Sequence, residues 1–407
     1  MKSINKRNKK PNVKIISIGR FHHFNLARQL QKFDILESIH SGYPMIKLNN
    51  EKGIPKDKIK TFPYLEIIYQ FLIRYFPSIN TNLLQNISDY SHKLLSKNTA
   101  KSINSSNILI ASARAGLEAG KSIQKKGGIY ICDRGSTHIA HQNKILKDEY
   151  KKFGLTFKDI NKRKIEREIS EYKEADMISI ASKFVQKTFI KHGINKKKLF
   201  INPYGVNTKI FSKRRKKNTD EFIILFVGRI GIRKGIFYLI NAFNKLKILN
   251  KKLIFVGSIE NNIKNRFQDF LCEQIIHIKH VNSSKLAQIY TNCDIFVNPA
   301  IEEGLSLVIP EAMACGCVII ATENTGASDF YKNNHAGFII KARSENIIRK
   351  KIYFLYKNEK IRKKMSQNAL NIVKNINGWD QYGKNWYKKL NFLSKKIKYK
   401  SKNQDKY

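Results

Sequence analysis

Two short apolar runs, each followed by a helical pattern, open the two halves of the chain. Residues 13–19, VKIISIG, are rich in β-branched side chains and close on a glycine, and FNLARQLQKF follows with helical spacing. Residues 222–228, FIILFVG, repeat the plan, and GIFYLINAFNKL follows as an amphipathic helix. Each half therefore predicts a strand, a tight turn and a helix at the start of its own α/β unit.

The same alternation continues through both halves. Further apolar runs of strand length lie at 107–113, 128–133, 177–182, 252–258, 275–281, 294–300, 317–322 and 336–340. Short apolar strands that alternate with helices predict parallel sheets covered by helices on both faces. The segment 202–221, rich in loop-forming and charged residues, is the expected boundary, and the pattern after residue 341 is helical.

The length of 407 residues is sufficient for two domains. We expect a first domain over residues 12–205 and a second over 206–380, followed by a helix at 381–395 that crosses back to the first domain. Residues 396–407 are mostly Lys, Ser, Asn and Gln, and we expect a disordered basic tail there.

The formal net charge is +46, but its distribution argues against a nucleic-acid site. Lysines run evenly from Lys2 to Lys406 among many Asn and Ile residues, as an A/T-rich coding bias would produce. Attraction to an anionic membrane surface or an acidic glycolipid is the alternative explanation. We expect no nucleic-acid partner.

No apolar run reaches the roughly 20 residues that a membrane-spanning helix needs, and MKSINKRNKKPN is not followed by a signal-type apolar block. We therefore expect a cytoplasmic protein, with a peripheral position on the inner membrane face as the alternative. The stretch PYLEIIYQFLIRYFPSI, residues 63–79, bears on this point because it mixes aromatic, aliphatic and basic residues at helical spacing. We expect a buried helix of the first domain, with a membrane-facing or acceptor-admitting helix as the alternative.

Cysteine and histidine patterns give weak support for a metal site. Five scattered cysteines form no Cys-x-x-Cys pair and are expected to be reduced core residues. The pairs His138/His141 and His277/His280 have metal-ligand spacing on a helix, but no third ligand is evident. Structural or surface histidines are the favoured interpretation.

The stretch EEGLSLVIPEAMACG, from Glu302, separates Glu303 and Glu311 by seven residues. In one helix these carboxylates would point about 80° apart, and in one strand they would lie roughly 26 Å apart. A loop through Gly304 that turns into a helix, with Ser306 as N-cap, would bring both to one site, although Pro310 then suggests an irregular first turn or a later helix start. Carboxylates beside a phosphate-attracting helix start make sense as acceptors of hydrogen bonds from sugar and ribose hydroxyl groups.

This stretch resembles the family-4 retaining glycosyltransferases of the GT-B fold, whose second domain carries a Glu-x7-Glu element followed by EAMACG. The resemblance implies two Rossmann-like domains with parallel sheets that face each other across a cleft, the first binding the acceptor and the second the nucleotide sugar. Glu303 would contact donor-sugar hydroxyls and Glu311 the ribose. Backbone amides around Gly304, Leu305 and Ser306 would lie against sugar and phosphates.

The resemblance extends to FVGRIGIRKG, where Arg229 and Lys234 match the basic pair that this family places on the donor diphosphate. These cations would neutralise the departing nucleoside diphosphate. The chain has no Asp-x-Asp element, which GT-A enzymes use to hold a divalent ion. The resemblance therefore implies a metal-independent, retaining hexosyltransferase without cofactor, in which Glu303 and Glu311 are binding groups and not an acid–base pair.

The first domain offers fewer signals. Gly19 and Arg20 lie in the loop after the first strand, where the family brings backbone close to the donor and acceptor. Asp133, Arg134 and His138 follow the end of the strand at 128–133, a place where α/β sheets bind ligands. We favour His138 as a site residue near the donor sugar, with a structural histidine as the main alternative.

The adjacent His22 and His23 are weaker site candidates, because a loop histidine needs no special reason. We expect, on the family resemblance, a glycosyltransferase that moves a sugar from a nucleotide-diphosphate sugar to a hydroxyl of a surface-glycan precursor, with a glycan or lipid-linked acceptor. The alternatives are a GT-B relative with other chemistry, such as an epimerase or phosphorylase, and a basic protein that binds anionic surfaces without turnover.

Overall fold

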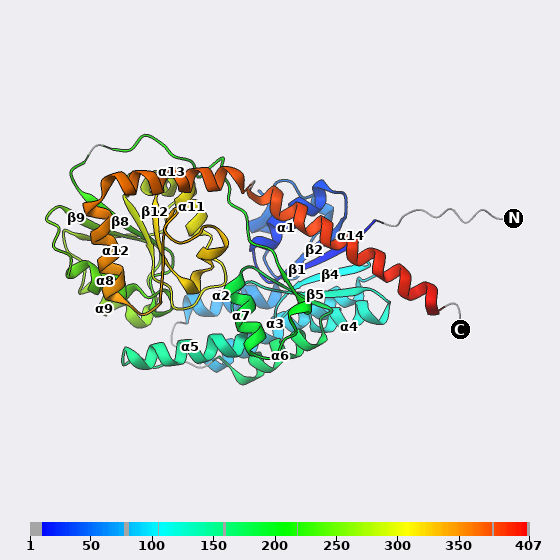
Figure 1. Cartoon of the computed structure of the whole chain (residues 1–407). Helices are drawn as coiled ribbons and strands as arrows, with labels where there is room; N and C mark the ends of the chain where they lie inside the picture. The colour runs from blue at the N-terminus through cyan, green and yellow to red at the C-terminus, as the bar shows by residue number, and fades with distance from the viewer. Residues whose placement is uncertain are drawn as a thin grey trace.

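The computed structural model contains two parallel sheets in two lobes that lie side by side (Figure 1). It describes residues 10–76, 81–104, 106–157, 160–217, 219–376 and 378–404. Seven strands form the first sheet, in the order β3-β2-β1-β4-β5-β6-β7. Their bounds are β1 Val13–Ser17, β2 Leu36–Ser41, β3 Ile59–Thr61, β4 Ile108–Ser112, β5 Ile129–Arg134, β6 Met177–Ile180 and β7 Leu199–Ile201.

The second sheet has six strands in the order β10-β9-β8-β11-β12-β13. Their bounds are β8 Phe222–Val227, β9 Lys251–Val256, β10 Ile275–Ile278, β11 Ile295–Asn298, β12 Val318–Thr322 and β13 Gly337–Ile340. All six side chains of β8 are buried, as expected for a central strand with helices on both faces. The predicted two-sheet α/β architecture is confirmed.

Helices connect the strands and cover the sheets. In the first lobe they are α1 His22–Lys32, α2 Tyr64–Tyr75, α3 Thr81–Lys101, α4 Leu117–Lys125, α5 Ile139–Lys152, α6 Lys162–Glu174 and α7 Lys183–Lys191. In the second lobe they are α8 Ile236–Asn244, α9 Lys264–Gln268, α10 Ser283–Asn292, α11 Val308–Ala314, α12 Glu345–Lys357 and α13 Glu359–Asn375. A last helix, α14 Gly378–Gln404, leaves the second lobe.

Helix α14 lies along α1 of the first lobe, so the end of the chain ties the two lobes together (Figure 1). Asp380 accepts hydrogen bonds from Gln29 Nε2 at 2.9 Å and from Lys32 Nζ at 2.6 Å, and the Trp386 side chain is fully buried. The backbone stays helical as far as Gln404, where the sequence predicted disorder from residue 396; residues 405–407 lie outside the described part.

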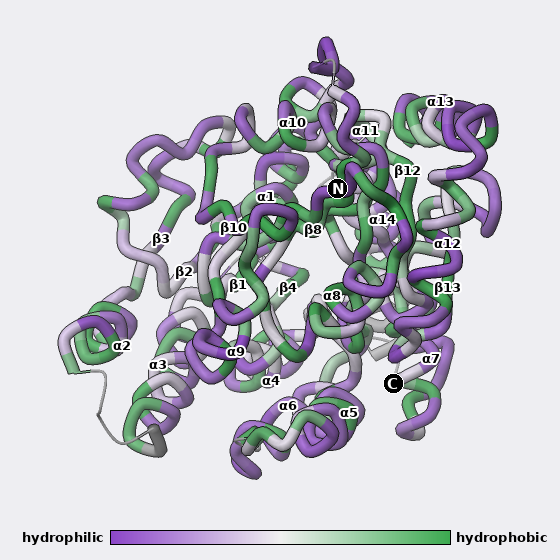
Figure 2. The backbone as a smooth tube through the Cα atoms, turned by 90° about the vertical axis from the view of Figure 1, so that its left-hand side faces the viewer, coloured by the Kyte–Doolittle hydropathy of each residue, from purple (hydrophilic) through white to green (hydrophobic). Residues whose placement is uncertain are grey.

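Helix α2 is not a buried helix, and that prediction was wrong. It packs on α3 at one edge of the molecule, outside the sheets (Figure 2), and none of its side chains is buried. Phe71 and Tyr75 are 53% and 59% exposed, and their ring centroids lie 4.8 Å apart. Residues 77–79 of the predicted helix lie outside the described residues.

Candidate active site

A cleft of about 970 Å³ opens between the two lobes, and both contribute to its lining. The first lobe supplies Arg20, Arg28 and Lys32, and the second supplies Leu307 and Glu311. Glu51 pairs with both arginines, so the loop after β1 and helix α1 present a basic wall held by one buried acid. A cleft with cations on one side and a carboxylate on the other suits a ligand with both anionic and hydroxyl groups.

Glu311 lies in the first turn of α11 and reaches the cleft. Burial raises the pKa of its carboxyl group to about 7, and the hydrogen bond from Tyr290 Oη at 3.4 Å opposes this shift only weakly. A half-buried carboxylate with one long hydrogen bond retains acceptor capacity. Hydroxyl groups of a ligand would fill that capacity and favour the ionised form.

Helix α11 starts later than the predicted Ser306 N-cap implies, and the later start that Pro310 suggested is confirmed. Leu307, not Ser306, is the N-cap, and the helix begins at Val308. Ser306 Oγ instead accepts a hydrogen bond from Asn298 Nδ2 at 2.7 Å. Pro310 consequently falls at the third helical position, where no intrahelical N–H bond is lost.

Glu303 forms a compact charged cluster with two basic side chains. It pairs with Lys234 Nζ and lies 3.5 Å from Arg233 Nη2. Burial lowers the pKa of Lys234, and the adjacent Arg233 adds to this effect. Glu302 also pairs with Arg233, so two cations lie among two carboxylates here, and an anionic ligand group would have to compete with Glu303 for the N–H groups of Lys234 and Arg233.

Glu302, which sequence reasoning did not select, binds the two lobes to each other. Its fully buried carboxylate pairs with Arg233 Nε at 2.7 Å and accepts hydrogen bonds from Ser136 Oγ at 2.8 Å and Thr137 Oγ1 at 2.6 Å. Burial opposes ionisation, but Arg233 and the hydrogen bonds from the first lobe lower the pKa of Glu302 to about 2. Glu302 is therefore an ionised contact between lobes and not a ligand group.

The close approach of the two lobes explains why a glycine, Gly304, follows Glu302 and Glu303. A Cβ atom at Gly304 would lie 1.8 Å from Gly135 O in the first lobe, so only glycine fits. Gly304 O also accepts a hydrogen bond from Ser182 Oγ at 2.6 Å. Leu305 is buried, and the Ser306 N–H donates to Thr325 O at 3.0 Å, so that amide is already engaged within the protein.

Arg229 lies apart from the Glu303 cluster. Its side chain is 68% exposed and pairs with Glu260 at 3.4 Å, beside a separate hollow that Tyr150 also lines. Arg233 occupies the place beside Glu302 and Glu303 instead. The sequence could have flagged Arg233 only by its position one residue before Lys234.

The contacts of His138 are those of a structural histidine, the alternative to its predicted site role. It is the N-cap of α5 and accepts a hydrogen bond from the Ala140 N–H at 3.3 Å. Its ring stacks on His192 with centroids 4.3 Å apart, and it is buried. Burial, with His192 and Arg134 nearby, lowers the pKa of His138 to about 3.

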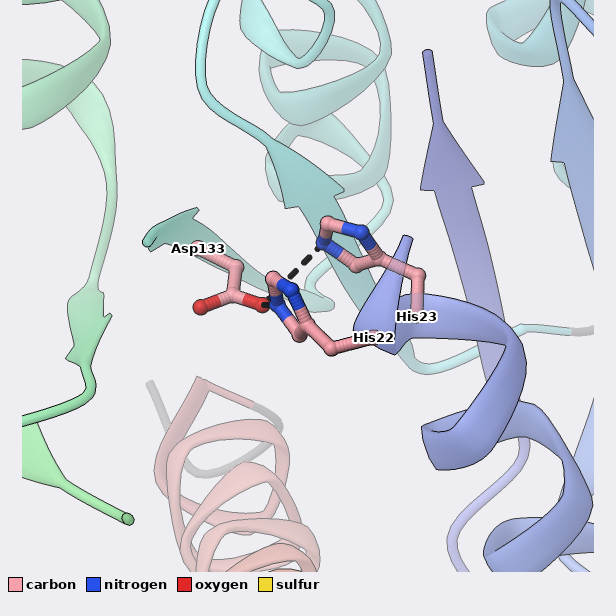
Figure 3. Close-up of side chains that lie close together, drawn as sticks. All are labelled: His22, His23 and Asp133. Atoms are coloured by element: carbon pink, nitrogen blue, oxygen red, sulfur yellow. Dashed lines mark hydrogen bonds and ion pairs between the residues drawn. The ribbon is translucent and has the colours of Figure 1, made fainter. Parts of the chain in front are cut away.

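Within the described residues, neither His138/His141 nor His277/His280 belongs to a group of three side chains that could hold a metal. His22, His23 and Asp133 form such a group, with ligand atoms within 4.8 Å of one another. Asp133 Oδ2 lies 2.7 Å from His22 Nε2 and 3.1 Å from His23 Nε2, distances of direct hydrogen bonds and ion pairs (Figure 3). His22 therefore hydrogen-bonds Asp133, whereas His23 lies within ion-pair distance of the same carboxylate and its Nε2 has no hydrogen-bond partner among the described residues. Gly19 lies beside it, and its carbonyl accepts a hydrogen bond from Ser17 Oγ at 2.6 Å.

The second lobe is similar in sequence to a known protein family. Residues 207–371 match the model of the family described as glycosyl transferases group 1. The capsular polysaccharide biosynthesis glycosyltransferase CapM of Staphylococcus aureus is 35% identical over 175 residues, which cover 42% of this chain and 46% of CapM. An N,N'-diacetylbacillosaminyl-diphospho-undecaprenol α-1,3-N-acetylgalactosaminyltransferase of Campylobacter jejuni is 29% identical over 44% of this chain and 46% of its own. The chain spans about half the length of the curated relatives it matches.

Solved structures are similar over nearly the whole chain. Anabaena HepE, in complex with UDP and glucose, covers 93% of this chain and 99% of its own with a TM-score of 0.68 at 14% identity. A sucrose-phosphate synthase from Thermosynechococcus elongatus covers 92% of this chain and 96% of its own with a TM-score of 0.66 at 16% identity. At this identity the likeness establishes the fold, and the predicted GT-B arrangement of two Rossmann-like domains is confirmed.

Proposed function

We propose that the protein is a glycosyltransferase that moves a sugar from a nucleotide-diphosphate sugar to a hydroxyl of a surface-glycan precursor, because residues 207–371 match the model of the glycosyl transferases group 1 family. Its relatives with printed roles in capsular polysaccharide synthesis and on a diphospho-undecaprenol carrier support a glycan or lipid-linked acceptor. The chain matches each of these relatives over about half of the relative's length. The nucleotide-sugar donor and the glycan acceptor are therefore proposed and not taken over from the relatives.

The observation that carries this proposal is the shared lining of the cleft. Arg20 from the first lobe and Glu311 from the second face the same space, with further cations on α1. The cations suit a diphosphate, and the Glu311 carboxylate suits ribose hydroxyls. Lys234 and Arg233, at the neighbouring Glu303, would take up charge on the departing nucleoside diphosphate.

Retention of anomeric configuration and independence from metal ions are part of the same proposal. Lys234 and Arg233 would donate hydrogen bonds to the diphosphate at the place where other transferases use a divalent ion. Glu303 itself is paired with Lys234 and is suited to hydrogen-bond sugar hydroxyls, and Gly304 holds its loop against the first lobe. Closure of the lobes around the donor would exclude water as a competing acceptor.

A ligand panel tests this assignment. The purified chain is mixed with UDP-, GDP-, ADP- and dTDP-sugars in EDTA, and thermal stability and release of nucleoside diphosphate are measured. We expect one nucleotide class to stabilise the protein, by about 2.7 kcal/mol at 100 times its dissociation constant, and to be slowly hydrolysed. Failure of every nucleotide would contradict the donor site, and activity that EDTA abolishes would contradict metal independence.

We also propose that helix α2 rests on an anionic membrane surface, where a lipid-linked acceptor would be found. Among the described residues, no helix is long and apolar enough to cross a bilayer. Helix α2 instead exposes Tyr64, Phe71 and Tyr75, with Arg74 among them. Exposed aromatic rings beside a cation, in a chain of net charge +46, complement a bilayer that carries negative head groups.

Vesicle flotation tests the role of α2. We expect the protein to float with phosphatidylglycerol-containing vesicles, and the double variant Phe71→Ser/Tyr75→Ser to bind them about tenfold more weakly, because two exposed rings no longer enter the interface. Leu249→Ser removes a 92% exposed apolar side chain from the other lobe and serves as the matched control. Equal binding by the double variant and the wild type would assign the interaction to general charge alone.

A further inference from the structure

The first three strands of the first sheet end side by side. Ser17, Ser41 and Thr61, the last residues of β1, β2 and β3, are paired in register across the parallel sheet. The Gly42 N–H donates to Ser17 O at 3.3 Å, and the Phe62 N–H donates to Ser41 O at 2.8 Å. The chain segments that follow the three strands therefore leave the sheet at one level and share one edge of the first lobe.

Each of these segments exposes a large apolar or aromatic side chain. Phe21 follows β1 and is 57% exposed, Met45 and Ile46 follow β2, and Tyr64 follows β3 and is 74% exposed. Ile46 is 78% exposed. We call these four residues the apolar rim. Because adjacent strands lie about 4.8 Å apart, side chains from the three segments are near enough to contact a single hydrocarbon chain.

The apolar rim borders the cleft between the lobes. Phe21 directly follows Arg20, which lines the cleft. Ile46 lies in the same connection as Glu51 and Lys52, which also line it. A ligand held in the cleft on the side of the first lobe can therefore extend onto the apolar rim.

The cleft wall beside the apolar rim offers positive charge to a ligand. Arg20 and Arg28 share one acid, Glu51, whose side chain is 1% exposed. Lys52 is exposed and forms no ion pair with any residue that the structure describes. An anionic group would therefore meet Lys52 without having to displace a carboxylate from it.

We propose that the acceptor is a glycan joined through phosphate to a long hydrocarbon chain, with the phosphate at Lys52 and the chain over the apolar rim; this role rests on the proposed glycosyltransferase function. A cation beside a row of exposed apolar side chains complements the phosphate and hydrocarbon parts of one molecule, and a free glycan lacks both parts. Tyr64 is the last member of the rim and the first residue of α2. The rim therefore joins the cleft to the helix that we place on the bilayer.

Binding of soluble lipid phosphates tests this subsite. The purified chain is titrated calorimetrically with farnesyl phosphate, with the shorter dimethylallyl phosphate, and with farnesol, which lacks the phosphate, all below their critical micelle concentrations. We expect farnesyl phosphate to bind about tenfold or more tightly than either, because it alone uses the rim and Lys52 together. Phe21→Ser/Ile46→Ser should weaken farnesyl phosphate about tenfold, and Lys52→Ala should weaken both phosphates while farnesol is unaffected.

A transfer assay tests whether the subsite serves the acceptor. The labelled donor found in the ligand panel is incubated with a lipid extract of the source cells, and label in the chloroform phase is measured. We expect label to enter that phase. Phe21→Ser/Ile46→Ser should lower the rate about tenfold at limiting extract, and saturating extract should restore it, because the variant loses affinity for the hydrocarbon chain.

The outcomes separate the subsite from the proposed function. Ile190→Ser removes a 44% exposed apolar side chain from α7 of the same lobe and should behave as wild type. A wild type that binds a nucleotide but binds farnesyl phosphate no more tightly than dimethylallyl phosphate would overturn the subsite alone. A wild type that binds no nucleotide would overturn the proposed function and the acceptor role with it. A dimer that Phe21→Ser/Ile46→Ser abolishes would assign the rim to a second copy of the chain and overturn the proposal.

Discussion

Glu311→Ala is expected to weaken nucleotide binding by about 100-fold or more, because ribose hydroxyls would lose a charged hydrogen-bond acceptor in a half-buried setting. In a thermal shift assay at 100 times the wild-type dissociation constant, the wild type should gain about 2.7 kcal/mol and the variant almost nothing. Glu273→Ala removes an exposed carboxylate of the same lobe and should leave the shift unchanged. A variant with the full wild-type shift would remove Glu311 from the donor site.

The pH dependence of the ligand-free protein gives a second readout of Glu311. Its pKa is raised from 4.5 to about 7, so ionisation of this group costs stability above pH 7 and costs nothing below pH 4.5. Glu311→Gln carries no charge at either pH. The variant should therefore be more stable than the wild type at pH 8, by about 1–3 kcal/mol, and closest to it at pH 4.5. A buried carboxylate that destabilises the ligand-free protein when it ionises is expected of a residue that binds a ligand.

The sequence predicted those features of the fold that depend on local pattern. The apolar runs at 222–228 and 294–300 became buried central strands because their β-branched and aromatic residues suit a strand covered on both faces. Strands β2, β3 and β7 were not predicted. Strands β3 and β7 have three residues each and lie at the edges of the first sheet. Strand β2 lies inside the sheet, but its sequence LESIHS is interrupted by polar residues and gives no continuous apolar run.

Helix α2 shows where periodicity fails. Its apolar residues at helical spacing correctly predicted a helix, but the pattern of one helix does not state what covers its apolar face. Only the packing of α2 on α3 and the exposure of Phe71 and Tyr75 separate a core helix from a surface one. The N-cap of α11 was predicted wrongly for a similar reason. Ser306 Oγ accepts a hydrogen bond from the distant Asn298 side chain, and Leu307 is the N-cap.

Candidate site residues were predicted where a local motif marks them and missed where their partners are distant in sequence. Glu303, Glu311 and Lys234 were selected from a local motif, and the structure puts Glu303 and Lys234 in contact. Glu302 was not selected and His22 ranked as a weak candidate, because their partners are distant in sequence. Thr137 lies 165 residues from Glu302, and Asp133 lies 111 residues from His22. A single sequence gives no register between elements so far apart.

Glu302→Gln should strongly destabilise the junction of the lobes. The substitution leaves Arg233 without its closest carboxylate partner and replaces an ionised acceptor for Ser136 and Thr137 with a neutral amide. A pKa lowered from 4.5 to about 2 corresponds to about 3 kcal/mol of stability at neutral pH. Loss of one partner from a buried ion pair typically costs about 3–5 kcal/mol, which agrees with this value.

The sign of the pH effect makes the Glu302 prediction specific. Because the folded pKa lies below the unfolded value, this stability is fully present above pH 4.5 and is lost as the pH falls through 2. Urea unfolding and proteolysis in the segment 202–221 should show Glu302→Gln weaker than the wild type at pH 7, with the difference shrinking below pH 4.5. Glu359→Gln, which removes an exposed ion pair with Lys363, should match the wild type throughout. If the two variants behave alike, the lobes are held by α14 and the glycine contacts, and the Glu302 carboxylate is dispensable for their docking.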